Sequence, residues 1–428
     1  MNRVLLLFIF FIAFTFAVPQ AHAKTKTLQQ LIDETPENGT LQLSNVIYKE
    51  NVVIHRNITI KGSEHTVLES LNQKPAIEIE NAEHVSINNV ALQNSYLGIS
   101  GKKSQHLRFE NLHFKNVRSG IQLYNTNDVT LKHLKITGIP GHFSKKGNGI
   151  ALYNSANVKV HGNTIQHVQD GVYIESVNQI SLMNNKIYNG RYGIHFMYTK
   201  NAQTTGNTFK KNVTGIMLMM SENVKLDDNQ LYDQNGLNAS GMTLFQSKLI
   251  KIFANEFQNN RTAISAQNLT NSTIKKNVFL MNQSAIELIR SNEENQVKRN
   301  NFIGNIVNLR SDGTGSQIVQ NYYDDYAGID VNSDGIGDRN YVALQSFGQW
   351  MVRQPAYQYF IESPSVVLLN EIDRQTNVIE KEQLVDQEPL MQSTMSIKRK
   401  NTMIVWKLVL GIGLVFTILW FWRKEIRG

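Results

Sequence analysis

Blocks of 22 residues repeat along most of this chain, and this period constrains the fold more than any other feature. Each block opens with Gly or Ala followed by Ile, Val or Met, and the openings lie at Ala76, Gly98, Gly120, Gly149, Gly171, Gly193, Gly215, Gly241, Ala263 and Ala285. Seven of the nine gaps are 22 residues, and the other two are 29 and 26. A fixed period of this length is typical of architectures in which each block packs only on its neighbours.

Apolar and polar residues alternate within each block, as in IALYNSANVKVHG at residues 150–162. A period of two indicates half-buried strands, and no stretch of the repeat region has a helical period. Asn recurs fourteen residues after several openings, where it should occupy turns and stack as an amide ladder; these residues are Asn163, Asn185, Asn207, Asn229, Asn255 and Asn277. The Leu-x-x-Leu-x-Leu frame of a leucine-rich repeat is missing. The sequence therefore predicts an all-β, right-handed parallel β-helix of 22-residue coils.

The two ends of the chain predict its location. The apolar run LLLFIFFIAFTFAV and the Ala-His-Ala that ends at Ala23 are typical of a secretory signal peptide. The apolar run from Thr402 to Trp422 is long enough to cross a bilayer. We therefore expect an extracytoplasmic protein, periplasmic or on the outer cell surface, anchored in the cytoplasmic membrane by one C-terminal helix. The expected parts are a signal peptide (1–23), an N-terminal cap with the first coils (24–75), the parallel β-helix (76–345), a C-terminal cap and stalk (346–400), a transmembrane helix (401–422) and a cytoplasmic tail (423–428).

Most of the formal net charge of +8 belongs to the expected anchor. From Lys398 onward seven Lys or Arg residues and one Glu give a local charge of +6, and Arg3 would leave with the signal peptide, so residues 24–397 carry about +1. This balance gives no reason to expect nucleic-acid binding. Cysteine is absent, which excludes disulfides, thiolate nucleophiles and Cys-based metal sites.

Soft metal ligands gather at positions that the repeat predicts to face outward. Ile, Val, Leu and Phe occupy the first and third positions after each opening, so the second and fourth positions should face solvent. Two consecutive coils there place His195, Met197, Met217 and Met219 on one patch, which Met220 adjoins. Imidazole and thioether donors without thiolates suit Cu(I) better than zinc or calcium. The alternative is an adaptable Met-rich surface that docks a partner.

Two coils are longer than the rest and carry insertions, around residues 138–147 and 236–240. Each insertion ends directly before a block opening, so both loops should lie beside the same strand face and frame the patch. His142 lies on the first loop, where it could reach the patch as a further copper ligand or remain a solvated loop histidine.

Four motifs resemble the NosD family of copper-handling proteins, which serve the maturation of nitrous-oxide reductase. They are GHFSKKGNGI (141–150), RYGIHFMY (191–198), LMMS (218–221) and NYYDDYAGIDVNSDGIGDRNY (321–341). The resemblance implies a β-helix that works with the ATPase and permease subunits of an ABC transporter, a copper chaperone lipoprotein and nitrous-oxide reductase. It also implies copper contacts at His195, Met197 and Met219, whereas Met217 and Met220 come from the outward-face argument. Met220 stands where an aromatic residue is expected, and the C-terminal transmembrane helix departs from many relatives.

A second candidate metal site matches the first nine positions of a calcium loop. Its oxygen donors would be the side chains or backbone of Asp330, Asn332, Asp334, Ile336 and Asp338, with Gly335 at the turn. Tyr341 stands where the bidentate Glu should be, so an Asx-turn-rich capping loop is the alternative. In either case we expect a structural role at the C-terminal end of the stack.

A carbohydrate-active β-helix is the rival class, because such folds carry acids and bases on an outer strand face. Asp170 and Glu175 could form a carboxylate pair near Tyr173, and Lys145 and Lys146 stand on the nearby loop. The Asp-Pro-His signature of alginate epimerases has no counterpart, however, and the best surface is rich in Met. We therefore expect a copper-binding and transfer accessory protein rather than an enzyme, with a lyase- or epimerase-like β-helix and a non-metal docking scaffold as alternatives.

Overall fold

The computed structural model describes residues 26–394, apart from 64, 314, 344–346, 348–349, 351–353, 361–362 and 377–383, together with residue 413. The chain forms two compact units, residues 1–169 and residues 170–428, and both have the predicted all-β, right-handed parallel β-solenoid fold. The expected signal peptide and cytoplasmic tail lie outside the described residues, and so does the expected transmembrane helix except for Gly413. No helix in the described part of the chain is long and apolar enough to span a membrane.

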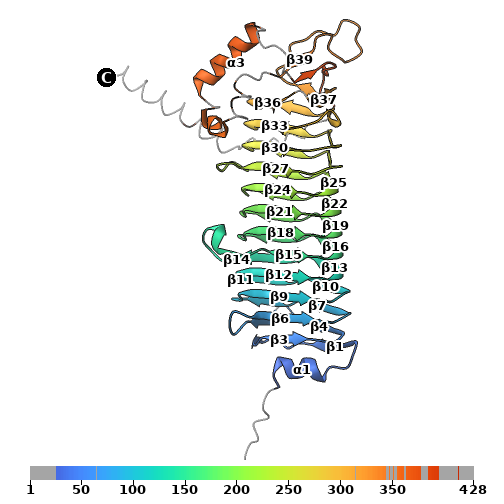
Figure 1. Ribbon diagram of the computed structural model, residues 1–428. Helices are drawn as coiled ribbons and strands as arrows, with labels where there is room; N and C mark the ends of the chain where they lie inside the picture. Colours follow the sequence, from blue (N-terminus) through green and yellow to red (C-terminus); the bar gives the residue numbers. More distant parts are fainter. Residues whose placement is uncertain are drawn as a thin grey trace, which may run out of the picture. The chain divides into compact units, whose positions relative to one another are not determined.

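The first unit winds through three parallel sheets, here called A, B and C, and each turn contributes one strand to each sheet (Figure 1). Its strands are, in sheet A, β1 (Gly39–Gln42), β4 (Ile58–Lys61), β7 (Val85–Asn88), β10 (Leu107–Glu110), β13 (Asn127–Lys132) and β16 (Ala156–His161); in sheet B, β2 (Ile47–Lys49), β5 (Val67–Glu69), β8 (Ala91–Gln93), β11 (His113–Val117), β14 (Lys135–Gly138) and β17 (Thr164–Gln166); and in sheet C, β3 (Val52–Ile54), β6 (Pro75–Glu80), β9 (Leu97–Lys102), β12 (Ser119–Tyr124) and β15 (Ile150–Tyr153). Helix α1 (Leu28–Glu34) begins at a capping box on Thr27 and packs against β3, and the short 3-10 helix η1 (Phe143–Lys145) lies in the first inserted loop.

The second unit has the same three-sheet winding and carries the candidate copper ligands except His142. Its strands are, in sheet A, β19 (Asn178–Met183), β22 (Lys200–Thr205), β25 (Glu222–Asp227), β28 (Lys251–Phe253), β31 (Thr273–Lys275), β34 (Asn295–Lys298) and β37 (Ser316–Val319); in sheet B, β20 (Lys186–Tyr188), β23 (Thr208–Lys210), β26 (Gln230–Tyr232), β29 (Glu256–Gln258), β32 (Val278–Leu280), β35 (Asn301–Ile303) and β38 (Tyr322–Tyr323); and in sheet C, β18 (Asp170–Glu175), β21 (Tyr192–Met197), β24 (Thr214–Met219), β27 (Ser240–Phe245), β30 (Thr262–Gln267), β33 (Ser284–Ile289) and β36 (Val307–Ser311).

The predicted amide ladder is confirmed, and the residue before each ladder Asn makes the sharp turn. Asn255 is buried, its Nδ2 donates to Asn277 Oδ1 at 3.0 Å, and its own Oδ1 accepts from Asn229 N and Nδ2 at 2.9 and 3.0 Å. The left-handed residue is the one before each ladder position, for example Ala254 (φ 55°) and Lys276 (φ 57°). The ladder Asn therefore satisfies buried backbone groups from one turn to the next, while its neighbour makes the corner.

Residues beyond the last turn close the C-terminal end of the second unit. Strand β40 (Val385–Asp386) pairs antiparallel with β39 (Tyr341–Val342). The buried carboxylate of Asp386 accepts from Asn321 N and Nδ2, both at 2.9 Å, and so occupies the place of the next ladder amide. The sequence predicted a C-terminal cap and stalk for residues 346–400, but it did not mark Asp386 as the residue that contacts the last turn.

The described residues before β40 include the 3-10 helix η2 (Pro355–Phe360) and helix α3 (Pro364–Thr376). Val366 of α3 packs with Val307 of β36 and with Phe347, so this segment lies against one edge of sheet C.

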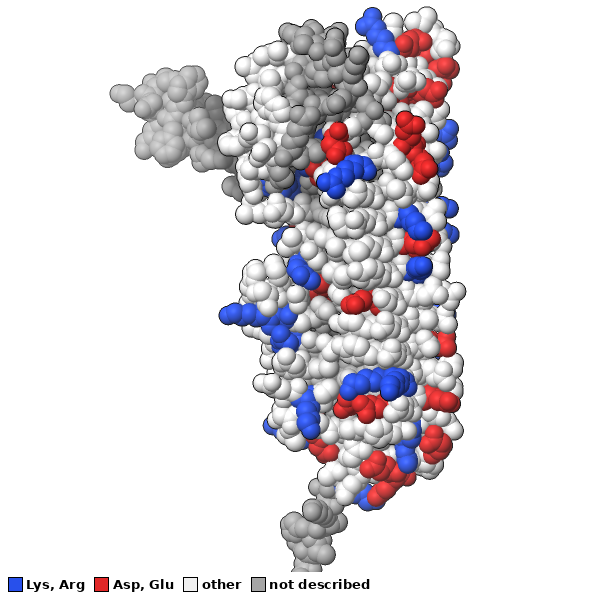
Figure 2. All heavy atoms as spheres, viewed as in Figure 1, with Lys and Arg blue, Asp and Glu red and all other residues white. Residues whose placement is uncertain are grey.

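Charged side chains of both signs are interspersed on the outer face of the described residues. In Figure 2 the Lys and Arg side chains and the Asp and Glu side chains occur in small groups, separated by neutral surface. Lys102 of β9, for example, contacts both Glu78, at 2.7 Å, and Glu80, at 3.1 Å, on the neighbouring strand β6. Exposed pairs of this kind contribute little to stability, about 0–1 kcal/mol each.

Candidate functional site: a histidine and methionine face on sheet C

Strand alternation directs the candidate ligands of the second unit away from the solenoid core. Ile194 and Phe196 of β21 and Ile216 and Leu218 of β24 are fully buried in the core, as predicted. The intervening residues therefore project from the outer face of sheet C. Gly193 is the second residue of β21, and a Cβ atom there would lie 2.4 Å from the carbonyl oxygen of Gly215. The small residue at each block opening thus lets the turns approach closely enough to stack.

The parallel register places the ligands in two columns. His195 lies beside Met217, and Met197 lies beside Met219, on the neighbouring strands β21 and β24. Neighbouring strands are about 4.8 Å apart, so the flexible thioether chains can reach a shared point next to the imidazole. We call these four residues, His195, Met197, Met217 and Met219, the His–Met face.

The exposure of His195 differs from the sequence-based expectation of a solvent-facing imidazole. Only 7% of His195 is accessible, whereas the three Met residues of the face are half-buried. The rings of Tyr173 and Tyr192 contact the imidazole edge-on, with centroids 5.1 and 5.0 Å away. Alternation correctly gave the direction of the side chain, but the two aromatic neighbours cover it.

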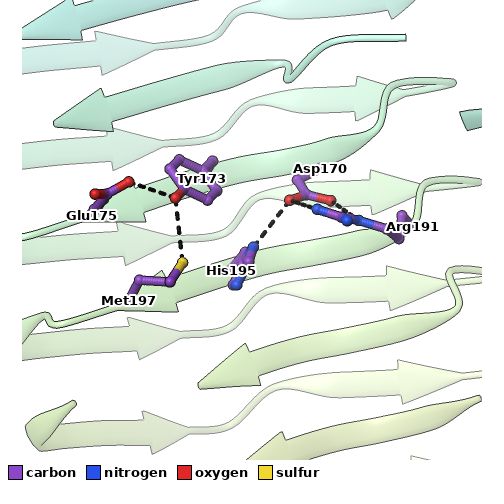
Figure 3. A network of polar contacts seen from close by, with 6 residues as sticks. All are labelled: Asp170, Tyr173, Glu175, Arg191, His195 and Met197. Atoms are coloured by element: carbon purple, nitrogen blue, oxygen red, sulfur yellow. Dashed lines mark hydrogen bonds and ion pairs between the residues drawn. The ribbon is translucent and has the colours of Figure 1, made fainter. Parts of the chain in front are cut away.

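Asp170, the first residue of β18, fixes the imidazole from a buried position (Figure 3). Its Oδ2 lies 3.1 Å from His195 Nδ1, and Arg191 donates to the same carboxylate through Nε at 2.9 Å and Nη2 at 2.7 Å. Burial alone would raise the pKa of Asp170, but the hydrogen bonds from His195 and Arg191 outweigh it and lower the pKa below its ordinary value. The carboxylate is therefore ionised at neutral pH and acts only as an acceptor.

The acceptor at Nδ1 determines what the other ring nitrogen can do. Because an ionised carboxylate cannot donate, His195 Nδ1 must carry a proton, and in the neutral ring Nε2 then keeps its lone pair. Nε2 is buried and has no hydrogen-bond partner among the described residues. A carboxylate that holds one imidazole nitrogen while the other stays available is the usual support for a metal-binding histidine. Sequence reasoning missed this support because it paired Asp170 with Glu175 and gave Arg191 no role.

Glu175 belongs to a separate part of the network. Tyr173 Oη lies 2.6 Å from Glu175 Oε2 and 3.3 Å from Met197 Sδ (Figure 3). The two carboxylates that could have formed a catalytic pair in the carbohydrate-active alternative thus have different partners: Asp170 binds Arg191 and His195, and Glu175 binds Tyr173. Asp170 is ionised and accepts hydrogen bonds from two residues, so it has no proton to donate. This weakens the case for Asp170 as the general acid of a glycosidase-like pair.

The two remaining copper candidates do not belong to the strands of the His–Met face. Met220 follows the end of β24 in a left-handed conformation (φ 47°), so it occupies a corner and not a strand column. His142 belongs to the first unit, where it caps η1, with Nδ1 2.9 Å from Ser144 Oγ. Lys145 ends η1, and Lys146 follows it as a largely buried residue whose pKa is lowered by burial.

The calcium-like loop has the local geometry of an ordered turn. Asp330 Oδ2 accepts from Gly335 N at 2.9 Å, Asp334 Oδ1 accepts from Ile336 N at 2.8 Å, and Asp338 Oδ2 accepts from Val331 N at 2.7 Å. The bond to Asp334 forms an Asx turn, and the other two bonds tie the loop together around Gly335, whose φ of 83° suits only glycine well. Within the described ranges, no group of three or more His, Asp or Glu side chains is arranged to hold a metal ion.

Comparison with known proteins identifies the family. Residues 132–341 match the family model described as "Periplasmic copper-binding protein (NosD)", and residues 44–209 match the right-handed β-helix region. The chain belongs to the NosD family. The region matched by the NosD model contains the His–Met face, Asp170, Arg191, His142 and the 330–338 loop.

Two curated NosD relatives are similar to part of the chain. The "Probable ABC transporter binding protein NosD" of Stutzerimonas stutzeri is 29% identical over 126 residues, and the protein of the same name from Pseudomonas aeruginosa is 30% identical over 129 residues. Each alignment covers 28% of this chain and 29% of the relative, so the similarity spans less than a third of those NosD proteins.

Solved structures with a similar fold are β-helix enzymes that act on carbohydrates. The A-module of mannuronan C-5 epimerase AlgE6 from Azotobacter vinelandii has a TM-score of 0.50 and 14% identity, over 67% of this chain and 90% of that module. DFA-IIIase from Arthrobacter chlorophenolicus A6, without its lid, has a TM-score of 0.52 and 12% identity, over 65% and 87%. At these identities the NosD-family chain shares the fold with them, and the likeness carries no inference about activity.

Proposed function

We propose that this chain is an extracytoplasmic copper-binding and transfer protein that carries Cu(I) on its His–Met face. The observation that carries the proposal is the buried Nε2 of His195, which lacks a hydrogen-bond partner among the described residues while Asp170 holds Nδ1. Three thioether side chains on the same two strands supply soft, neutral donors beside it. Such a set favours Cu(I), and the family description as a periplasmic copper-binding protein supports both the metal and the location.

The partners that we propose follow from the family. Because the curated relatives are named as ABC transporter binding proteins, we propose that the chain works with the ATPase and permease subunits of such a transporter. We propose further that it receives copper from a chaperone lipoprotein and delivers it to the copper sites of nitrous-oxide reductase. Residues 401–422, which lie outside the described residues except for Gly413, would hold it at the membrane near the permease.

Two further metal contacts belong to this proposal. His142 and Met220 would be additional copper contacts, although neither belongs to the strands of the His–Met face. The 330–338 loop would bind calcium in a structural role, since its carboxylates surround Gly335 in the first nine positions of a calcium loop.

An anaerobic Cu(I) titration of the full chain against a chromophoric competing chelator tests the central proposal. The variant M197L/M217L/M219L keeps the bulk of the side chains but removes the thioethers, and we expect it to lose tight binding. The matched control is M183L/M281L, because these two Met residues are exposed outside the face. Equal Cu(I) affinity in all three proteins would place the metal elsewhere, and no binding in any of them would favour a docking scaffold.

A further inference from the structure

A hard anionic ligand stands directly beside the soft donors of the His–Met face. Glu175 of β18 lies next to Met197 of β21 in the parallel register, as Tyr173 lies next to His195. Neighbouring strands are about 4.8 Å apart, so a Glu side chain at this position is long enough to reach a metal held by Met197. Carboxylates favour harder cations, and a Glu ligand would stabilise Cu(II) relative to Cu(I).

Tyr173 occupies one oxygen of that carboxylate. Its hydroxyl lies 2.6 Å from Glu175 Oε2 and 3.3 Å from Met197 Sδ, and thus stands between the oxygen and the sulfur (Figure 3). A phenol has one proton, and a charge-assisted bond as short as this one directs the proton to the carboxylate. The ring is itself held in place by its edge-on contact with the imidazole of His195, at 5.1 Å between centroids.

We propose that Tyr173 is a specificity-determining residue that keeps Glu175 out of the copper coordination shell and so biases the site toward Cu(I) over Cu(II). The inference rests on the proposed function, because it concerns the metal selectivity of the same face. Asp170, the other nearby carboxylate, is already committed to Arg191 through two hydrogen bonds, at 2.9 and 2.7 Å. With Asp170 paired to Arg191 and Glu175 Oε2 held by Tyr173, the metal is left to the imidazole of His195 and the thioethers.

The test compares Cu(II) and Cu(I) binding by the full chain and its Y173F variant. We expect Y173F to bind Cu(II) at least about tenfold more tightly, the scale on which partners of metal ligands tune affinity. The electron paramagnetic resonance spectrum of Cu(II)-loaded Y173F should show an additional oxygen ligand. The Cu(I) affinity of the variant should change much less than its Cu(II) affinity. The double variant Y173F/E175Q should return to the low Cu(II) affinity of the unmodified chain, because the carboxylate is then gone.

Tyr192 provides the matched control. Its ring also contacts His195 edge-on, at 5.0 Å, but it stacks under the Arg191 guanidinium and its strand neighbour in β18 is Asp170 and not Glu175. Y192F should therefore leave Cu(II) affinity unchanged. Cu(I) binding by the unmodified chain together with unaltered Cu(II) affinity in Y173F would overturn this inference alone. Failure of the unmodified chain to bind Cu(I) would overturn the proposed function and the inference with it.

Discussion

Replacing Asp170 with Asn tests whether the buried carboxylate prepares His195 for metal binding. The substitution D170N preserves shape but exchanges one acceptor oxygen for an NH2 group. In the native chain Oδ1 accepts from Arg191 Nε, and Oδ2 accepts from both Arg191 Nη2 and His195 Nδ1. An amide oxygen in either place leaves at least one of these donors facing the new NH2 group.

The expected result is weaker support of His195 in either orientation of the amide, each of which keeps one of the two bonds from Arg191. With the oxygen at the Oδ1 place, the NH2 group faces His195 Nδ1, which must then accept, so the proton moves to Nε2 and the free lone pair is lost. With the oxygen at the Oδ2 place, Nδ1–H keeps an acceptor, but this acceptor no longer carries a negative charge. Loss of such a supporting partner typically weakens metal binding about 10- to 100-fold, or about 1.4–2.8 kcal/mol. We therefore expect Cu(I) affinity to fall by that factor.

The assay is the anaerobic chelator competition, run on the full chain after circular dichroism has shown that D170N keeps its strand content. The control is E222Q, which makes the same chemical change at a surface carboxylate that pairs with Lys200 at 3.6 Å and Lys248 at 3.2 Å. Cu(I) affinity in folded D170N that equals that of E222Q and the unmodified chain would refute the proposed role of Asp170.

Three further predictions concern stability. N255A removes four buried ladder hydrogen bonds and leaves at least two donors without an acceptor, so the free energy of unfolding in urea should fall by about 2–6 kcal/mol. The control T208A loses one exposed hydrogen bond of 3.4 Å and should change the free energy of unfolding by less than about 0.5 kcal/mol. Similar losses in the two variants would contradict the ladder's role. Because the pKa of Asp170 is lower in the folded than in the unfolded chain, its ionisation stabilises the fold above the unfolded pKa of about 3.9 and ceases to do so as the pH falls through the folded pKa. Unfolding free energy below about pH 4 should thus decline more steeply in the unmodified chain than in D170N, and parallel curves would exclude this linkage. Calcium at about a hundred times its Kd should stabilise the chain by about 2.7 kcal/mol, a gain that chelation and D334A both remove; an unchanged Tm would leave the loop as a capping turn.

The period of the sequence was sufficient to predict the fold because every turn needs the same buried apolar positions and the same length. Alternation at Ile194, Phe196, Ile216 and Leu218 set the core, and the constant 22-residue spacing set the register that brings His195 beside Met217. Where the period ends, the sequence predicted a cap but not the residues that form it. The return of Asp386 to the ladder depends on one carboxylate meeting the donors of the last turn, and no repeat marks such a residue.

The candidate site was only partly predictable for a related reason. Alternation tells which way a side chain points, but not which neighbours cover it, so the burial of His195 by Tyr173 and Tyr192 was missed. The link between Asp170 and Arg191 was available in principle. The register sets Asp170 beside Tyr192, and Arg191 directly precedes Tyr192 in the sequence. An acidic and a basic side chain therefore lie nearly opposite one another on adjacent turns.

X-ray absorption spectroscopy of the Cu(I)-loaded full chain tests the central claim most directly, because it reports the atoms bound to the metal. The account predicts sulfur scatterers together with an imidazole nitrogen, with the sulfur lost in M197L/M217L/M219L and the imidazole lost in H195A. A copper shell made only of oxygen and nitrogen, or a sulfur shell that survives in the triple variant, would contradict the assignment of copper to the His–Met face.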